Sequence, residues 1–169
     1  MTSLLQTHRM VRRISELELE WLRERGIRGI VSDLDNTLAP WHGDDIPNDI
    51  GAWLERVKCA KIGVCLCSNT RRPARLARIA EALGIHHVPG NAGKPGTTGV
   101  FKALELMAVL PNEAVMAGDQ LFTDMVAGNR AGLITVLVNP LSTKEFIGTQ
   151  LVSRNAEKLI LRGERARPK

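Results

Sequence analysis

The chain has 169 residues, of which 44% are hydrophobic and 24% are charged, with a formal net charge of +5 and a pI of about 9.5. This composition is typical of a globular protein that can bury a core, and the length fits a single domain. No apolar run approaches the roughly 18 residues that span a bilayer, and residues 1–13 lack the features of a signal peptide, so we expect a cytoplasmic protein.

The first predicted element is an amphipathic helix over residues 12–25. Its apolar side chains recur at helical spacing, at Ile14, Leu17, Trp21 and Leu22, which suits packing against a sheet. The basic residues ahead of it would also suit an anionic membrane surface. Four glutamates between residues 16 and 24 disfavour membrane contact along the whole segment.

Downstream, short apolar runs alternate with longer segments of helical periodicity. We expect strands at 28–34, 62–67, 86–89, 114–118 and 133–139, and helices at 48–59, 71–83, 97–110 and 120–131. Two of these helices are followed by the glycines that commonly end a helix, Gly84 and Gly132. Strands that are apolar almost throughout and alternate with helices indicate a parallel sheet covered on both faces.

The predicted fold class is therefore α/β, with three layers, a Rossmann-like topology and a mainly parallel sheet of about five strands. We expect one domain over 1–169, with a core at about 10–160 and a basic tail at about 161–169. The basic stretch 151–169 either contacts a phosphate-bearing polymer or an anionic membrane surface or is simply solvated. Cys65 and Cys67 alternate within an apolar run and are expected to be reduced, buried small hydrophobes.

Polar residues gather where the predicted strands end, which is where parallel sheets bind ligands. They are Asp33, Asp35 and Thr37 after the first strand, Ser68 and Asn69 after the second, Lys94 in the glycine-rich loop 90–96, and Gly118, Asp119 and Asp124 after the fourth. Asp33, Asp119 and Asp124 offer the hard oxygen ligands that Mg²⁺ prefers. Lys94 and the Ser68 hydroxyl could bind a phosphoryl group.

These groups suit phosphoryl transfer. A carboxylate beside a metal and a phosphate can act as a nucleophile and form an aspartyl-phosphate. A divalent cation would also relieve the repulsion between Asp33 and Asp35, which lie on the same side of an extended chain. Asp35 could then protonate the leaving oxygen and later activate water. Thr37 could hold Asp35 in place by a hydrogen bond.

The order of these motifs resembles that of the haloacid dehalogenase (HAD) superfamily of phosphatases. The resemblance implies a HAD fold, with Asp33 as nucleophile, Asp35 as general acid/base, and Ser68, Asn69 and Lys94 around the phosphate. It further implies Mg²⁺ as cofactor, held by Asp33, Asp119, Asp124 and the backbone carbonyl of Asp35, with Thr37 and Gly118 in support.

The stretches 33-DLDNTL-38, 68-SNT-70 and 118-GDQLFTD-124 are similar to the IIIA subfamily, and in particular to its YqeG-like branch, which is related to phosphatidylglycerophosphate phosphatases. The similarity extends to 139-NPLSTKEFIGT-149 and covers roughly residues 10–160. It implies a phosphorylated substrate, with phosphatidylglycerophosphate or a similar phospholipid favoured. A peripheral position at the inner face of an anionic membrane would follow.

Cap domains of this superfamily are inserted after the first or the second motif. The intervals 38–67 and 69–93 are each nearly filled by one helix and one strand, so we expect a capless enzyme. A site without a lid cannot easily enclose a small metabolite. It can accept a phosphate on a large or surface-bound molecule.

Further residues near these motifs are candidates for substrate contact. Arg71 and Arg72 follow the second motif, and Arg71, Arg75 and Arg78 share a helical face that either attracts an anionic substrate or is only solvated. Trp41 either touches the ligand or covers the edge of the core. His42 is expected to be a solvent-exposed polar residue.

Two other functions fit parts of the sequence. One is a capless phosphatase of soluble sugar or nucleotide phosphates, or of phosphoproteins. The other is a non-catalytic phospho-signalling module of the receiver type. Receivers carry the phosphorylated aspartate at a later strand end, where this chain has Cys67 and Ser68, which argues against that function. No nucleic-acid-binding module is recognisable.

Overall fold

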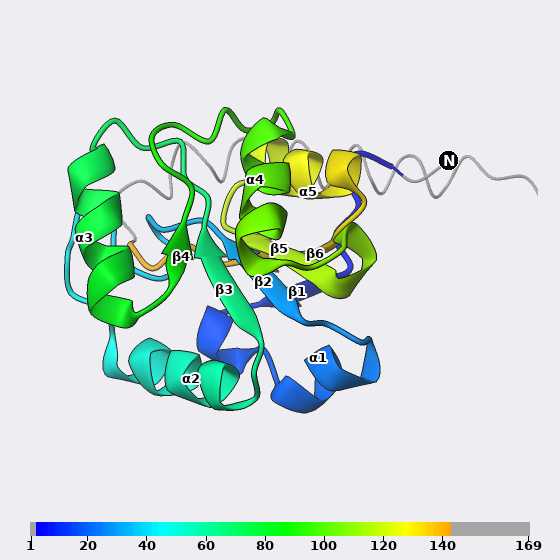
Figure 1. Ribbon diagram of the computed structural model, residues 1–169, viewed down its shortest axis with the longest axis horizontal. Helices are drawn as coiled ribbons and strands as arrows, with labels where there is room; N and C mark the ends of the chain where they lie inside the picture. Colours follow the sequence, from blue (N-terminus) through cyan, green and yellow to red (C-terminus); the bar gives the residue numbers. More distant parts are fainter. Residues whose placement is uncertain (1–2, 143–169) are drawn as a thin grey trace, which may run out of the picture.

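The computed structural model describes residues 3–142, and within them strands and helices alternate (Figure 1). The strands are β1 (Arg9–Val11), β2 (Gly29–Ser32), β3 (Gly63–Leu66), β4 (His86–His87), β5 (Ala114–Gly118) and β6 (Ile134–Val138). The helices are α1 (Leu19–Glu24), α2 (Asn48–Cys59), α3 (Pro73–Leu83), α4 (Thr98–Met107) and α5 (Val126–Ala131). Shorter helical turns lie at Ile14–Glu16, Pro111–Glu113 and Leu121–Met125. The basic tail and the stretch 143–149 lie outside the described residues.

The strands form one sheet in the order β1-β6-β5-β2-β3-β4, and every pairing in it is parallel. The predicted α/β class with a parallel sheet is confirmed. The sheet has six strands where the sequence predicts about five, because β1 was not anticipated. β1 has three residues, and the exposed Met10 between Arg9 and Val11 gives no apolar run that a sequence pattern could reveal.

The prediction of a single helix over residues 12–25 is wrong. The segment folds as the turn Ile14–Glu16 and the short helix α1, separated by extended backbone at Leu17 and Glu18. At this break the Leu17 carbonyl accepts a hydrogen bond from the indole Nε1 of Trp53, at 2.8 Å. The predicted packing role is confirmed, since Ile14, Leu17 and Leu22 are fully buried in the core.

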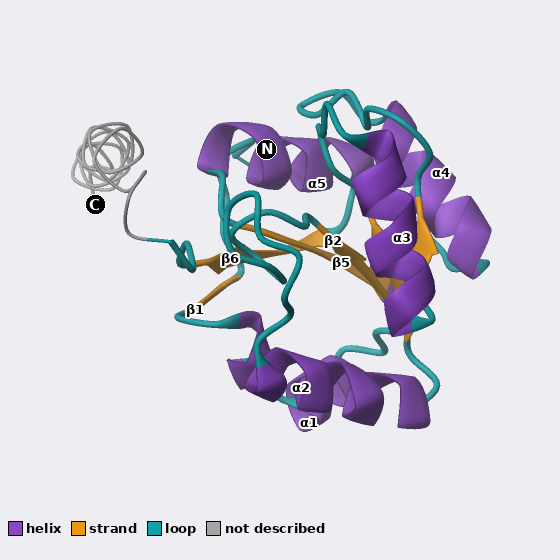
Figure 2. Cartoon of the chain, turned by 90° about the vertical axis from the view of Figure 1, so that its left-hand side faces the viewer, coloured by secondary structure: helices purple, strands orange, loops and turns teal. Residues whose placement is uncertain are grey.

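Helices cover both faces of the sheet, with α1 and α2 below it and α5 above it in Figure 2. Strand residues alternate between two apolar clusters, as the pleat requires. In β2, for example, Ile30 belongs to the cluster that includes α2 and α3, and Val31 to the one that includes α4 and α5. Cys65 and Cys67 are free, buried thiols, as predicted.

This architecture places three polar strand ends side by side. β2 lies between β3 and β5, so Asp33, Ser68 and Asp119 emerge from adjacent strands at one edge of the sheet. Within residues 3–142 the connections at 38–67 and 69–93 contain no inserted cap, in agreement with the prediction. No helix in the same range is long and apolar enough to cross a membrane.

The link between Trp53 and Leu17 can be tested by substituting phenylalanine for Trp53. The change leaves the buried Leu17 carbonyl without its donor and removes part of a side chain that is only 1% exposed. We expect the free energy of unfolding to fall by about 1–3 kcal/mol in urea titrations. The same change at the exposed Trp41 should alter it by less than about 0.5 kcal/mol. Equal effects at the two positions would contradict this account.

Candidate active site

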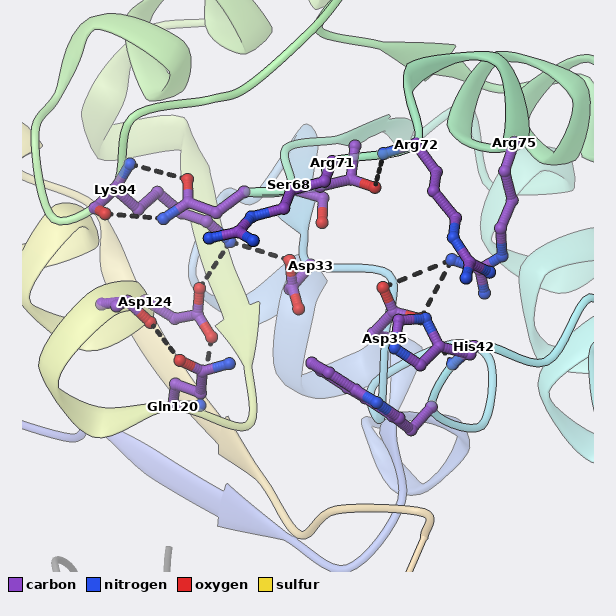
Figure 3. A pocket seen from close by; sticks show the side chains of 14 residues that line it. Asp33, Asp35, His42, Ser68, Arg71, Arg72, Arg75, Lys94, Gln120 and Asp124 are labelled. Atoms are coloured by element: carbon purple, nitrogen blue, oxygen red, sulfur yellow. Dashed lines mark hydrogen bonds and ion pairs between the residues drawn. The ribbon is translucent and has the colours of Figure 1, made fainter. Parts of the chain in front are cut away.

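A cavity of about 490 Å³ opens at the carboxyl ends of the strands (Figure 3). Its lining includes most of the residues singled out in the sequence: Asp33, Asp35, Trp41, Ser68, Asn69, Arg71, Arg72, Lys94 and Asp124. Asp119, Thr37 and Gly118 are buried around it. Residues that are distant in the sequence thus meet at a single site, as the position of the strand ends predicts.

The acidic cluster at the base of the site consists of Asp33, Asp119 and Asp124. One oxygen of each carboxylate lies within 4.8 Å of the other two, and all three residues are buried or nearly so. The Oδ1 atom of Asp119 is buried and has no hydrogen-bond partner among the described residues. Three converging carboxylates with an unsatisfied oxygen suit a hard divalent cation such as Mg²⁺.

The Lys94 side chain reaches into this cluster. Its ammonium group lies 2.9 Å from Oδ1 of Asp33 and 2.6 Å from Oδ1 of Asp124, while only 2% of the side chain is exposed. Burial alone would lower the pKa of Lys94, but the charges of Asp124 and Asp33 outweigh it and raise that pKa. Lys94 is therefore held as a cation beside the cluster.

Asp119 differs from the other two carboxylates because it forms no ion pair with Lys94. Burial raises the pKa of Asp119 to about 8, and the negative charges of Asp33 and Asp124 act in the same direction. Burial also raises the pKa of Asp124. Lys94 alone therefore does not balance the cluster, and without a metal cation Asp119 does not ionise easily at neutral pH.

The segment that carries Asp124 explains how this carboxylate enters the site. Residues Leu121–Met125 form a wide π-helical turn ahead of α5, so the helix predicted over 120–131 is interrupted at its start. The Gln120 backbone N–H donates to Oδ2 of Asp124 at 3.1 Å. Gly118 lies directly against the Asp124 carboxylate, and a Cβ atom at this position would overlap it. The absence of a side chain at Gly118 is thus a requirement for placing Asp124.

The loop that carries Lys94 is fixed by the second motif. The Asn69 side chain accepts a hydrogen bond from the Lys94 backbone N–H at 2.9 Å and donates to the Lys94 carbonyl at 2.7 Å. The Ser68 carbonyl accepts from the Ala92 N–H at 3.0 Å. The Asn69 amide, assigned from the sequence to phosphate binding, is thus engaged with the Lys94 backbone. Ser68 remains in the cavity wall.

Asp35 is oriented by groups that the sequence did not suggest. Its Oδ1 atom accepts the His42 backbone N–H at 3.2 Å and lies 3.0 Å from Nη1 of Arg75. The hydrogen bond expected from Thr37 to Asp35 is absent, and the buried Thr37 hydroxyl has no partner within residues 3–142. The carboxylate is turned toward α3 instead of back toward its own turn.

The rim of the cavity carries the three residues expected to contact substrate. Arg71 and Arg72 are exposed at the start of α3, and neither forms an ion pair with another described residue. The Trp41 side chain is 38% exposed, and its ring lies 4.6 Å from that of His42. His42 is exposed, as expected.

Sequence reasoning missed the role of Arg75 and the contribution of Gln120 and Thr123 to the cavity. Arg75 was grouped with Arg71 and Arg78 on one helical face, as a substrate contact or a solvated side chain. In the structure it lines the cavity but is buried and paired with Asp35 and Asp44, so it is not a solvated side chain. A pair of aspartates at 44–45 opposite a helix rich in arginine was the signal that could have suggested this pairing.

Comparison with known proteins agrees with this geometry. The family model described as mitochondrial PGP phosphatase matches residues 1–142. The chain belongs to this family of HAD-type phosphatases. It is 34% identical over 151 residues to the probable phosphatase YqeG of Bacillus subtilis, covering 89% of this chain and 86% of that protein.

A second member of the PGP phosphatase family is the chloroplastic/mitochondrial phosphatidylglycerophosphate phosphatase 1 of Arabidopsis thaliana. The two are 30% identical over 147 residues, which covers 82% of this chain but only 42% of the plant protein. The chain therefore spans less than half the length of that relative.

Solved structures of HAD-type proteins share the fold. The cobalt-bound deoxy-D-mannose-octulosonate 8-phosphate phosphatase of Haemophilus influenzae has a TM-score of 0.55 at 21% identity, covering 68% of this chain and 69% of that one. NagD of Escherichia coli K-12 has a TM-score of 0.53 at 14% identity, covering 72% and 91%. These structural similarities support the assignment of a HAD-type fold to this member of the PGP phosphatase family.

The raised pKa of Asp119 predicts that Mg²⁺ binding depends on pH. Between pH 3.8, the ordinary pKa, and about pH 8 the folded, metal-free protein keeps a proton on Asp119 that the unfolded chain has lost, so the stability that this proton contributes declines as the pH rises through that range. Because Mg²⁺ must displace that proton, the rise in Tm with Mg²⁺ should be larger at pH 8 than at pH 6. Thermal unfolding with and without Mg²⁺ measures this. An equal rise at both pH values, or a difference between the two pH values that is as large in Asp119→Asn as in the unsubstituted protein, would contradict the assignment.

The close contact at Gly118 gives a second prediction. In Gly118→Ala the new methyl group displaces the Asp124 carboxylate, so we expect Mg²⁺ to stop stabilising the protein and the free energy of unfolding to fall by about 1–3 kcal/mol. Gly51 provides the matched control, because it lies in α2 and a Cβ atom added there would meet no other atom within 4 Å. Gly51→Ala should be neutral or stabilising by up to about 1 kcal/mol. Urea unfolding with and without Mg²⁺ distinguishes the two variants.

Proposed function

We propose that the protein is a Mg²⁺-dependent phosphomonoesterase that works through a phosphorylated Asp33. The observation that carries this proposal is the buried Lys94 ammonium between Asp33 and Asp124, beside Asp119 and Ser68. The arrangement collects a nucleophile, a fixed cation and a set of metal ligands at one wall of an open cavity. Membership of a phosphatase family points to the same chemistry.

The first step is attack of Asp33 on the phosphorus of the substrate. Lys94 donates to Oδ1 of Asp33, and no described group donates to Oδ2, which leaves that oxygen available to form the new P–O bond. Asp35 supplies a proton to the ester oxygen as its bond to phosphorus breaks, so the alcohol leaves neutral. The product of this step is an aspartyl-phosphate on Asp33.

The second step returns the enzyme to its starting state. Asp35, now a carboxylate, takes a proton from water, and the water oxygen attacks phosphorus and releases Asp33 with inorganic phosphate. Lys94 and the Ser68 hydroxyl bind the phosphoryl oxygens in both steps and stabilise the dispersed negative charge. Mg²⁺, held by Asp33, Asp119 and Asp124 with the Asp35 carbonyl, would neutralise further charge on the phosphoryl group.

The favoured substrate is phosphatidylglycerophosphate or a similar phospholipid. The Arabidopsis relative carries that activity in its name, and residues 3–142 place no cap over the cavity. Arg71 and Arg72 at the rim offer two guanidinium groups to an anionic headgroup. Trp41, which lines the same cavity and is partly exposed, suits the interfacial region of an anionic bilayer, which the protein would contact peripherally.

A substitution at Asp33 tests the reaction. Phosphate release from phosphate esters in the presence of Mg²⁺ should fall by about 10³-fold or more in Asp33→Asn, because the amide cannot act as the nucleophile. Asp45→Asn makes the same chemical change at an exposed residue outside the cavity and should leave the rate unchanged. Release that persists in Asp33→Asn would exclude the mechanism.

The same assay separates the candidate substrates. The unsubstituted protein is given phosphatidylglycerophosphate in vesicles, soluble sugar and nucleotide phosphates, and a phosphopeptide. The proposal expects kcat/KM to be highest for the lipid. Preference for a soluble ester by orders of magnitude would exclude the lipid substrate and leave the phosphatase assignment intact.

A further inference from the structure

Arg75 is the most deeply buried arginine among the described residues, with 7% of its side chain exposed. It lies in the first turns of α3 and faces the loop that follows Asp35. A buried guanidinium group is costly unless its donors find acceptors, and charged acceptors compensate best. The acceptors of Arg75 therefore indicate what the residue does.

All of these acceptors belong to the segment 35–44. Nη1 of Arg75 lies 3.0 Å from Oδ1 and 3.3 Å from Oδ2 of Asp35 (Figure 3). Nε donates to Oδ1 of Asp44 at 2.9 Å, and Nη2 donates to the carbonyl of Gly43. One side chain thus connects α3 to both ends of the loop.

The contact with Asp35 has a specific consequence for that carboxylate. A carboxylate turns easily about its last side-chain bond unless hydrogen bonds fix its plane. Here two groups fix the plane of the Asp35 carboxylate: Nη1 of Arg75, and the His42 N–H, which lies 3.2 Å from Oδ1. The planar guanidinium group is itself held by Asp44 and Gly43, so its orientation is set before any ligand arrives.

We propose that Arg75 is a positioning residue that orients Asp35 for proton transfer to the leaving oxygen. This inference rests on the proposed function, in which Asp35 is the general acid. Arg75 does not need to touch the substrate in this role. It acts through the Asp35 carboxylate, so its loss should matter most for esters whose departure needs a proton.

Arg78 offers a matched comparison on the same helix. It forms an ion pair with Asp44, as Arg75 does, but it is exposed and makes no contact with Asp35. Arg78→Met weakens the attachment of the loop and leaves the Asp35 contact in place. Arg75→Met removes the Asp35 contact together with the bonds of Arg75 to Asp44 and Gly43, and leaves the ion pair of Arg78 with Asp44. A loss seen in Arg75→Met and not in Arg78→Met is therefore not explained by a weaker attachment of Asp44 alone.

The test compares two soluble esters in the presence of Mg²⁺: glycerol 3-phosphate, whose alkoxide leaves poorly, and p-nitrophenyl phosphate, whose phenolate leaves well without a proton. The quantity measured is kcat/KM, because it reports the step in which the leaving group departs. Arg75→Met should lower it about 30-fold for glycerol 3-phosphate and no more than about threefold for p-nitrophenyl phosphate. Arg78→Met should change both by less than about threefold. Arg75→Lys keeps the positive charge but lacks the planar, forked guanidinium group, so it should give an intermediate loss of kcat/KM for glycerol 3-phosphate.

The Asp35→Asn background separates failure of this inference from failure of the proposed function. Asp35→Asn should itself show the larger loss with glycerol 3-phosphate, and adding Arg75→Met to it should cause no further selective loss. If Asp35→Asn lowers kcat/KM equally for both esters, the assigned role of Asp35 is wrong and the inference is wrong with it. If Asp35→Asn lowers kcat/KM mainly for glycerol 3-phosphate while Arg75→Met and Arg75→Lys lower it equally for both esters, only the inference is overturned. Thermal unfolding of each variant fixes an assay temperature at which all of them are folded.

Discussion

The ion pairs of Lys94 with Asp33 and Asp124 are the interaction on which the rest of the site depends. Only 2% of the Lys94 side chain is exposed, and the side chains of its partners Asp33 and Asp124 are 7% and 1% exposed. Removing one partner of such a group leaves an uncompensated buried charge, which costs several kcal/mol. The three residues come from different segments of the chain, so the charges can balance only when the parallel sheet has brought β2, β5 and the loop 90–96 to the same edge.

The surrounding structure serves this constraint. The Asn69 side chain forms hydrogen bonds with both the N–H and the carbonyl of Lys94. These bonds fix the backbone position from which the ammonium group reaches the cluster. Gly118 leaves room for the Asp124 carboxylate, and the π-helical turn presents it. Asp119 is the carboxylate that Lys94 leaves unpaired, and its buried, unsatisfied oxygen is where a divalent cation would complete the charge balance.

The sequence predicted the members of this cluster because each one follows an apolar strand or lies in a glycine-rich loop. The carboxyl ends of neighbouring parallel strands meet at one edge, so chain position translates directly into spatial proximity. Arg75 could not be predicted in the same way, because its partners depend on the path of the irregular loop 36–44. The strand β1 was not predicted for another reason. An edge strand can have a single apolar residue facing the core, as Val11 does here, and it then shows no apolar run in the sequence.

The loop 36–44 also bears on how the proposed general acid, Asp35, can be controlled when residues 3–142 contain no inserted cap. In capped enzymes a closing domain can complete the catalytic arrangement when the substrate binds. Here Arg75 bonds Asp35 at one end of the loop and Asp44 at the other, and the tip with Trp41 and His42 lies beside the cavity. The arrangement is therefore assembled before the substrate arrives. The free-energy cost of burying the guanidinium group arises when the chain folds and not when the substrate binds. If Asp35 is the general acid, as proposed, its preorganisation beside the cavity suits a phosphate that remains attached to a large or membrane-bound molecule, since residues 3–142 contain no cap that has to close over it.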